Sequence, residues 1–431
     1  MNKVYQITGM LSSDDYYVKE YALDALRKFD FFMPSTYNQL KDFFLKESNS
    51  ILKTAMIKLF IAKKVEGASD FFLENISGCD LTVKNAIYDY VAELGLASHT
   101  GVLITNYYAE RDPRVRSKLV KTIAALNSKF KEANVTNELI FDFFSDADAR
   151  VRANACSLKA CLNDAILKAE FKRLLKDPSC RVVSEAAIGL YEAGEKEVFD
   201  HLYERITSAQ CAIEKASFTY AIGNMKDVRA GGILKDLLKD AEHTVRKSAI
   251  NGLGSQSDKS AINDLIDLYF TEQKNCRENL SKIVASLKSI NEFDSALAVL
   301  DRLKASNDSA HERASLVKLF AHFADSSLAN YLIVYLDDCD ARVRANSVEA
   351  LYYLKERGVV ASEFIVKNLL VSMCDSNTRV VANTVRALYG SGVVSVISVL
   401  REMLVSNIES VRNAACYVAS YFPEGLLLIK A

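Results

Sequence analysis

One short pattern recurs along the 431-residue sequence, and its regular spacing limits what the chain can fold into. Two copies, DADARVRANACSL at 146–158 and DCDARVRANSVEAL at 338–351, are nearly identical. Taking the Val of Val-Arg as an anchor, the copies have anchors at Val18, Leu52, Val83, Val115, Val151, Val182, Ala212, Val245, Cys276, Ala310, Val343, Val380 and Val411. Thirteen anchors between 18 and 411 give a mean spacing of about 33 residues. A fixed period of this length indicates stacked supersecondary units.

Each copy predicts two helices. Apolar residues fall at the anchor, four later and eight later, as in Val182, Ala186 and Leu190, which places them on one face of a first helix. Glycine often follows, where a left-handed cap would end that helix (Gly95, Gly194, Gly223, Gly254, Gly358 and Gly392). A second apolar pattern then ends in a pair such as Leu174-Leu175. With 4 prolines and 16 glycines in the chain, strands separated by turns are hard to place.

The signature Asp-x-x-Val-Arg-x-x-Ala resembles bacterial HEAT repeats of the armadillo/HEAT-like superfamily. It is found at Asp112/Val115/Arg116, Asp148/Val151/Arg152/Ala155 and Asp340/Val343/Arg344. The resemblance covers nearly the whole chain and implies an all-α fold, a right-handed α-α superhelix (α-solenoid) of about 13 HEAT-like helical hairpins. We expect residues 1–431 to form a single solenoid. This scaffold hosts many functions, so the fold alone does not select one.

Charged residues flank the anchors in matched series. Acidic residues three or five positions before the anchor, such as Asp148 and Asp177, can cap the first helix. Basic residues follow the anchor in nine copies: Lys19, Lys53, Lys84, Arg116, Arg152, Arg246, Arg277, Arg344 and Arg412. These could contact phosphates or form a charge ladder between repeats. Because 54 Lys and Arg face 55 Asp and Glu, we favour the ladder.

Two further recurring features are also assigned to the scaffold. Asn154, Asn346 and Asn383 follow the anchor by three residues and are expected to hydrogen-bond between repeats. Aromatic doublets such as Phe143-Phe144 and Tyr107-Tyr108 could stack on bases, but other copies have Leu-Leu in the same place. A position that alternates between Leu and Phe is typical of a core.

The sequence contains no pattern that predicts catalysis. It has no glycine-rich phosphate loop, H-E-x-x-H or G-x-S-x-G, and its nine cysteines include no C-x-x-C pair. Deoxyhypusine hydroxylases, which share this scaffold, carry several His-Glu dipeptides for a di-iron site, whereas this chain has only His311-Glu312. We therefore expect no enzyme activity, no cofactor and no metal. No signal peptide and no membrane-inserting segment are recognised, which predicts a cytoplasmic protein.

The favoured function is a non-enzymatic scaffold or adaptor that binds another protein, such as an acidic peptide or helix, on a concave face made by the second helices. The candidate residues are Lys168, Lys172, Arg173 and Lys176, followed by His201 and Arg205 on the next second helix. A solvated charged face would give the same pattern. Two alternatives stay open: a nucleic-acid-binding protein of the glycosylase-like HEAT type, with nucleic acid judged an improbable partner, and a lyase-type HEAT-like enzyme.

Two regions depart from the repeat. The copies at Ala212, Cys276 and Ala310 lack the acidic cap, which fits either a binding region or sequence drift. The sequence ends in PEGLLLIKA, which is too short and too apolar for a normal capping helix. We therefore expect an incomplete C-terminal cap, from truncation or a following domain.

Overall fold

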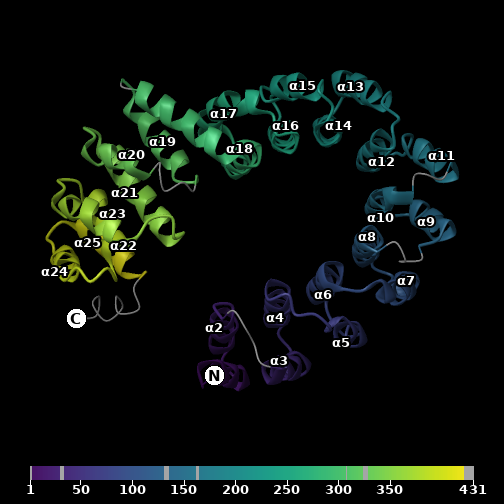
Figure 1. The fold of residues 1–431 in the computed structure, drawn as a ribbon, viewed down its shortest axis with the longest axis horizontal. Coiled ribbons are helices and arrows are strands. Elements are labelled where there is room, and N and C mark those ends of the chain that lie inside the picture. Colours follow the sequence, from purple (N-terminus) through teal and green to yellow (C-terminus); the bar gives the residue numbers. More distant parts are fainter. Residues whose placement is uncertain are drawn as a thin grey trace. The chain divides into compact units, whose positions relative to one another are not determined.

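The computed structural model describes residues 2–29, 34–130, 135–161, 165–306, 308–323 and 329–421. These residues form helices joined by short connections and no strand, which confirms the all-α prediction (Figure 1). The chain divides into two compact units, Met1–Ser208 and Ala209–Ala431. The division falls between the copies anchored at Val182 and Ala212. A single solenoid over 1–431 stays a prediction, and the C-terminal PEGLLLIKA lies outside the described residues.

In the first unit the anchors lie in alternate helices, which we call anchor helices. They are α2 (Tyr16–Leu26), α4 (Ser50–Ala62), α6 (Leu81–Leu94), α8 (Pro113–Lys129), α10 (Ala149–Ala155) and α12 (Cys180–Glu192). The others, called partner helices, are α1 (Asn2–Gly9), α3 (Pro34–Lys46), α5 (Ser69–Glu74), α7 (Thr100–Ala109), α9 (Asn137–Phe144), α11 (Ala165–Leu174) and α13 (Val198–Ser208). Short 3-10 turns are η1 (Met10–Ser12), η2 (Ala97–His99) and η3 (Cys156–Cys161). Each anchor helix is followed by its partner helix, as the repeat predicts.

The second unit repeats this order. Its anchor helices are α14 (Ala212–Asn224), α16 (His243–Gln256), the first part of α18 (Arg277–Ala305), α19 (Ala310–Phe320), α21 (Ala341–Glu356), α23 (Thr378–Leu388) and α25 (Glu409–Ala419). Its partner helices are α15 (Ala230–Leu237), α17 (Ile262–Asn275), the second part of α18, α20 (Ala329–Ile333), α22 (Ser362–Leu369) and α24 (Ser395–Leu404), with 3-10 turns η4 (Lys259–Ala261), η5 (Val334–Asp337) and η6 (Leu370–Cys374). In α18 the two helices meet at Asn291, whose φ of −171° and ψ of 113° are extended. The structure thus consists of stacked helical hairpins.

The burial pattern in the structure shifts the anchor position of three weak copies of the repeat. In α14, Phe218 and Ile222 are fully buried, so the anchor position is held by Glu214 rather than Ala212. The same reasoning places it at Asn279 in α18 and at Glu312 in α19, instead of Cys276 and Ala310. All three residues are polar, whereas the sequence pattern sought an apolar or small anchor. The sequence pattern therefore assigned these three anchors to residues two or three positions too early.

The anchor helices and the partner helices differ in the size of the side chains that lie between neighbouring helices of the same row. Consecutive anchor helices pack directly on one another, and α14 and α16 approach so closely that a Cβ on Gly223 would lie 2.5 Å from Gly252 Cα. Partner helices are held apart by rings, as in Tyr107 and Phe143, whose centroids are 4.7 Å apart. Small residues permit a shorter distance between helix axes than aromatic ones. Gly223 thus serves close packing inside α14, not the helix ending that the sequence suggested.

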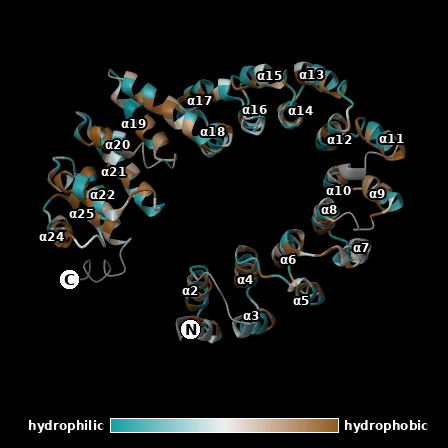
Figure 2. Cartoon of the chain, in the orientation of Figure 1, coloured by the Kyte–Doolittle hydropathy of each residue, from teal (hydrophilic) through white to brown (hydrophobic). Residues whose placement is uncertain are grey.

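The anchor row is the inner row of the first unit. Figure 1 shows α4, α6, α8, α10 and α12 on the inside of its curve, and α3, α5, α7, α9 and α11 on the outside. This fits the closer packing of the anchor helices. The expectation that second helices line the concave face is therefore wrong for this unit. Figure 2 shows hydrophobic and hydrophilic segments alternating along the helices, as expected for helices with one buried face.

Candidate functional site

The signature charges form a ladder between successive hairpins. In each rung a cation of one anchor helix pairs with the acid that precedes the next anchor helix, at 2.5–2.9 Å. The rungs are Lys19–Glu47, Lys84–Glu110, Arg116–Asp146, Arg152–Asp177, Lys215–Asp240, Arg246–Glu272, Arg313–Asp338 and Arg344–Asp375. The predicted ladder is confirmed for Lys19, Lys84, Arg116, Arg152, Arg246 and Arg344, and the revised register brings Lys215 and Arg313 into it. It is not found for Lys53, which lies over the ring of Phe44, or for Arg277 and Arg412, which make no ion pair with the described residues.

One rung shows how fully these cations are used. Arg152 donates from Nε and Nη2 to the Asp177 carboxylate at 2.8 and 2.9 Å. Its Nη1 donates to the carbonyl oxygens of Asp146 and Ala147. Asp177 also accepts the Ser179 amide at 2.8 Å. Because the guanidinium is engaged on every side, it is not available to a phosphate.

A second set of arginines is neutralised by the helix caps. Asp148 accepts the Arg150 amide at 2.8 Å, and its carboxylate pairs with the Arg150 guanidinium at 2.7 Å. The Arg150 side chain holds the pKa of Asp148 at about 2. Asp112 with Arg114, and Asp340 with Arg342, repeat this arrangement. The capping prediction is confirmed at Asp15, Asp80, Asp112, Asp148 and Asp340. It is wrong for Asp177, because the N-cap of α12 is Ser179 and the backbone amide that Asp177 accepts is that of Ser179.

The recurring asparagines connect neighbouring anchor helices, as predicted. Asn154 donates to the Ser117 carbonyl at 2.9 Å, Asn346 to Ala314 at 2.8 Å, and Asn383 to Ala345 at 3.0 Å. Their amide nitrogens are thus committed to the scaffold. The side-chain oxygens of Asn154 and Asn346 accept from Arg181 and Arg379, at 3.3 and 2.8 Å.

The predicted basic strip lies on the partner row, and acids neutralise much of it. Lys168 and Lys172 on α11 both pair with Glu195, at 2.5 and 2.8 Å, and these two lysines lower the pKa of Glu195 to about 2. Arg173 pairs with Glu170 at 2.6 Å. The remaining candidates are Lys176, which follows α11 and is exposed, and exposed His201 and half-buried Arg205 on α13. The strip stays a prediction, with less free charge than its sequence indicates.

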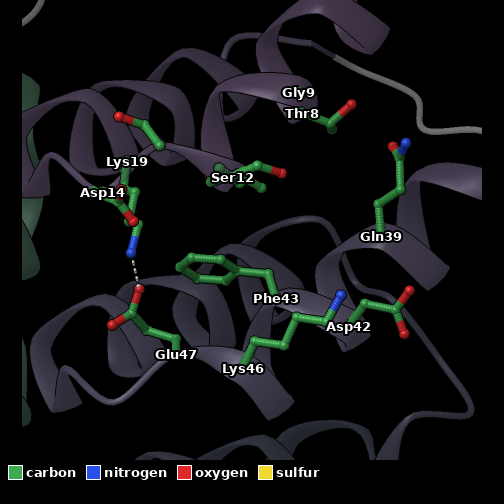
Figure 3. Close-up of a pocket in the computed structure, with 12 residues that line it drawn as sticks. Thr8, Gly9, Ser12, Asp14, Lys19, Gln39, Asp42, Phe43, Lys46 and Glu47 are labelled. Carbon is green, nitrogen blue, oxygen red and sulfur yellow. Dashed lines mark hydrogen bonds and ion pairs between the residues drawn. The ribbon is translucent and has the colours of Figure 1, made fainter.

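A polar pocket lies at the start of the first unit, between η1, α2 and α3 (Figure 3). Its volume is about 450 Å³, and its lining includes Lys19, Glu47, Asp42 and Lys46. Figure 3 shows Lys19 and Glu47 joined across one side of it. This pair is the first rung of the ladder. Two of the five charged residues that line the pocket therefore belong to the scaffold.

A groove on the anchor row of the second unit has a different character. It consists of two adjoining hollows of about 430 and 630 Å³, which share Glu349 of α21. We call it the α19–α25 groove. Its lining carries four cations, Lys318, Arg357, Arg379 and Arg386, against the single carboxylate of Glu349. Three half-exposed or exposed tyrosines, Tyr353, Tyr417 and Tyr421, lie in or beside it. The groove is therefore positively charged and aromatic.

Arg379 lacks a charged partner in its helix cap because the cap residue of α23 is an asparagine. In α23 the cap is Asn377, which accepts the Arg379 amide at 3.0 Å but carries no charge. The Arg379 guanidinium donates instead to the side-chain oxygen of Asn346 at 2.8 Å and lies 3.8 Å from Glu349. Its side chain is 55% exposed. Arg379 is thus oriented by the scaffold but only weakly neutralised.

Arg386 is held by rings rather than by acids. Its guanidinium lies 4.9 Å from the ring of Tyr352 and 4.0 Å from the ring of Tyr421. Its Nε is buried and donates to no acceptor among the described residues. Tyr421 is positioned in turn by a 2.7 Å hydrogen bond to the hydroxyl of Tyr417. Stacking of this kind fixes a guanidinium without using its hydrogen-bond donors, of which the two terminal amino groups, unlike the buried Nε, could serve a ligand.

Sequence reasoning missed this groove because its residues are dispersed over four helices. One signal was present, since Asn377 stands where Asp148 and Asp340 stand in the strongest copies. The second unit also places Arg386 six residues after its anchor, where α12 has Ile188. These two differences indicate a binding surface only when it is known which positions of the repeat face the surface.

Comparisons with models of protein families and with curated proteins gave no match. Among solved structures, Kap121p bound to Pho4p aligns with 98% of this chain and 49% of its own, at 13% identity and a TM-score of 0.46. Yeast importin-β (Kap95p) aligns with 98% and 66%, at 14% identity and 0.35. An engineered protein aligns with 100% of both chains, at 18% identity and 0.25. The chain spans about half the length of Kap121p. Likeness at this level is no evidence of a shared partner.

The stacked hairpins and the charge ladder make each unit an α-solenoid of HEAT-like repeats. That class follows from the geometry within each unit, where consecutive anchor helices pack on one another and a pair of one cation and one acid recurs at eight junctions. The described residues contain no cluster of His, Cys, Asp or Glu suited to a metal ion. No helix within the described ranges is long and apolar enough to cross a membrane.

Proposed function

We propose that this protein is a non-enzymatic scaffold or adaptor that binds another protein through the anchor row of its second unit. The observation that carries the proposal is the α19–α25 groove, with its unneutralised arginines and its tyrosines. Arginine and tyrosine are enriched among the residues that dominate binding energy in protein interfaces. The groove is a surface feature several hairpins long, which suits a polypeptide better than a small molecule.

The alternatives are less well supported. A nucleic-acid-binding protein would need many free cations, yet eight ladder cations are paired with acids and the net charge is −1. A lyase-type enzyme would need a deep pocket with converging polar groups. A cytoplasmic location and a role for Lys168, Lys172, Arg173, Lys176, His201 and Arg205 stay predictions.

Site-specific photo-crosslinking in the native cell tests the proposal and the basic strip together. A photoreactive amino acid would replace Tyr353 in the groove in one variant and His201 beside the strip in another. Both residues are exposed, so neither replacement should disturb the fold. We expect a discrete protein adduct from position 353. Adducts at background level from both positions, together with conversion of a small molecule by the purified protein, would contradict the proposal.

A further inference from the structure

The α19–α25 groove has one surface position per hairpin that recurs six residues after the anchor. In successive anchor helices it holds Lys318 of α19, Glu349 of α21, Arg386 of α23 and Tyr417 of α25. All four residues line the hollows. The row therefore crosses the stack of helices and presents two cations that are two hairpins apart.

The side-chain amides beside this row face the same hollows. Asn383 donates to the Ala345 carbonyl, and its oxygen accepts no hydrogen bond from the described residues. It lies between Arg379 and Arg386 on α23 and can accept from the amide of a bound chain. Asn346 has its oxygen occupied by Arg379. The cationic end of the groove thus offers two arginines and one free amide oxygen.

From this arrangement we infer that the groove binds an extended, acidic segment of a partner protein, with one carboxylate between Arg379 and Arg386 and a second near Lys318. The inference rests on the proposed function and adds the chemistry of the partner. Charge complementarity carries it, since four cations face one carboxylate. A guanidinium group can hold a carboxylate with paired hydrogen bonds, which a lysine cannot do, and neither arginine is paired with an acid closer than 3.8 Å among the described residues.

The geometry also sets the spacing of the acids. Packed helices lie about 8–10 Å apart, and an extended chain rises about 3.3 Å per residue, so about three residues span one hairpin. Arg386 and Lys318 are separated by two hairpins. The two acidic residues of the ligand should therefore be about six residues apart. Glu349 lies between the two cations and disfavours an acid at the middle of this interval.

A peptide selection tests the inference on the full chain. A phage-displayed library of random twelve-residue peptides would be panned against the wild type, against Arg379→Glu with Arg386→Glu, and against Lys239→Glu with Lys274→Glu. The last variant is a matched control, since it reverses two exposed charges of the second unit that lie outside the groove. We expect the wild type and the control to enrich peptides with two acids about six residues apart. The groove variant should lose this enrichment.

The selected peptides then permit a quantitative measurement. A fluorescein-labelled peptide would be titrated by anisotropy against the wild type, Arg386→Ala and Arg386→Lys, with circular dichroism to confirm that each variant is folded. We expect binding about 10-fold or more weaker for Arg386→Ala. Arg386→Lys keeps the charge but loses the planar pair of N–H donors, so its affinity for the peptide should lie between those of the wild type and Arg386→Ala. A twelve-nucleotide oligothymidylate should not compete at physiological salt.

The outcomes separate the two claims. Enrichment of neutral or basic peptides that depends on Arg379 and Arg386 would overturn the acidic chemistry and leave the proposed function standing. No enrichment, or acidic peptides bound equally by the groove variant, would overturn both the inference and the assignment of the groove. Competition by oligothymidylate would contradict the acidic peptide as the ligand of the groove and indicate nucleic acid instead.

Discussion

The helices α10 and α23 begin with the same pattern, yet they present different surfaces. In α10 the cap Asp148 pairs with Arg150, and the ladder acid Asp177 pairs with Arg152. In α23 the cap is Asn377, so Arg379 lies largely unneutralised beside Arg386. A repeat protein can therefore leave a scaffold charge unneutralised by changing its partner, without changing the charged residue itself.

The comparison separates two roles for arginine. Arginines of the ladder are buried or half-buried, bonded to acids and backbone carbonyls, and part of the fold. Arginines of the α19–α25 groove are more exposed and keep free donors. Removing the first kind should cost stability, whereas removing the second kind should cost binding.

The largest effect is expected from breaking a ladder rung. Arg152→Ala leaves Asp177, whose side chain is 7% exposed, without its cation. Loss of one partner from a buried pair costs about 3–5 kcal/mol, and the partial exposure of Arg152 places the expected loss in the free energy of unfolding near about 3 kcal/mol. Urea denaturation followed by circular dichroism measures it. The control is Arg150→Ala, two residues away and with its side chain 44% exposed, for which we expect a loss below about 1 kcal/mol. Equal losses would mean that the ladder does not stabilise the stack.

A smaller effect is expected from acid. The pKa values of Asp148 and Asp340 are lowered to about 2 by their arginines, from an ordinary value near 3.8. A lowered pKa stabilises the fold above about pH 4, and this contribution is lost as the pH falls from about 4 to about 2. Asp148→Asn should therefore be less stable than the wild type at pH 5, with a difference that shrinks by pH 3. Urea midpoints at both values measure it, and a constant difference would contradict the cap pairing.

The smallest loss of stability is expected in the groove. Arg386→Ala removes a side chain that stacks on two tyrosines but makes no ion pair with the described residues. We expect a decrease below about 1 kcal/mol in the free energy of unfolding. The urea midpoint should move far less than that of Arg152→Ala. A loss as large as that of Arg152→Ala would show that Arg386 belongs to the scaffold.

The repeat was readable from sequence because it is carried by short, local patterns. Asp caps such as Asp148 act within one helix turn, and the ladder pairs recur at one fixed interval. Thirteen copies therefore predicted helices, hairpins and pairing. The register failed only where a polar residue, as at Glu214 and Asn279, took an anchor position.

The candidate site was less predictable because it depends on which residues of neighbouring hairpins line the same hollow. Lys168 and Lys172 belong to a basic run in the sequence, but Glu195, in the connection between α12 and α13, neutralises them. The groove residues are separated by about 30 positions in the sequence and meet only through stacking. Local patterns cannot reveal charge balance between hairpins.

Asn377→Asp tests the central claim most directly, because it gives α23 the cap that α10 already has. The introduced carboxylate should pair with Arg379, as Asp148 pairs with Arg150, while leaving the helix capped and the stability within about 0.5 kcal/mol of the wild type. The measurement is the anisotropy titration of the acidic peptide against both proteins. Binding several-fold weaker in the variant at equal stability is the expected result. Unchanged affinity would contradict the claim that the missing cap charge creates the binding surface.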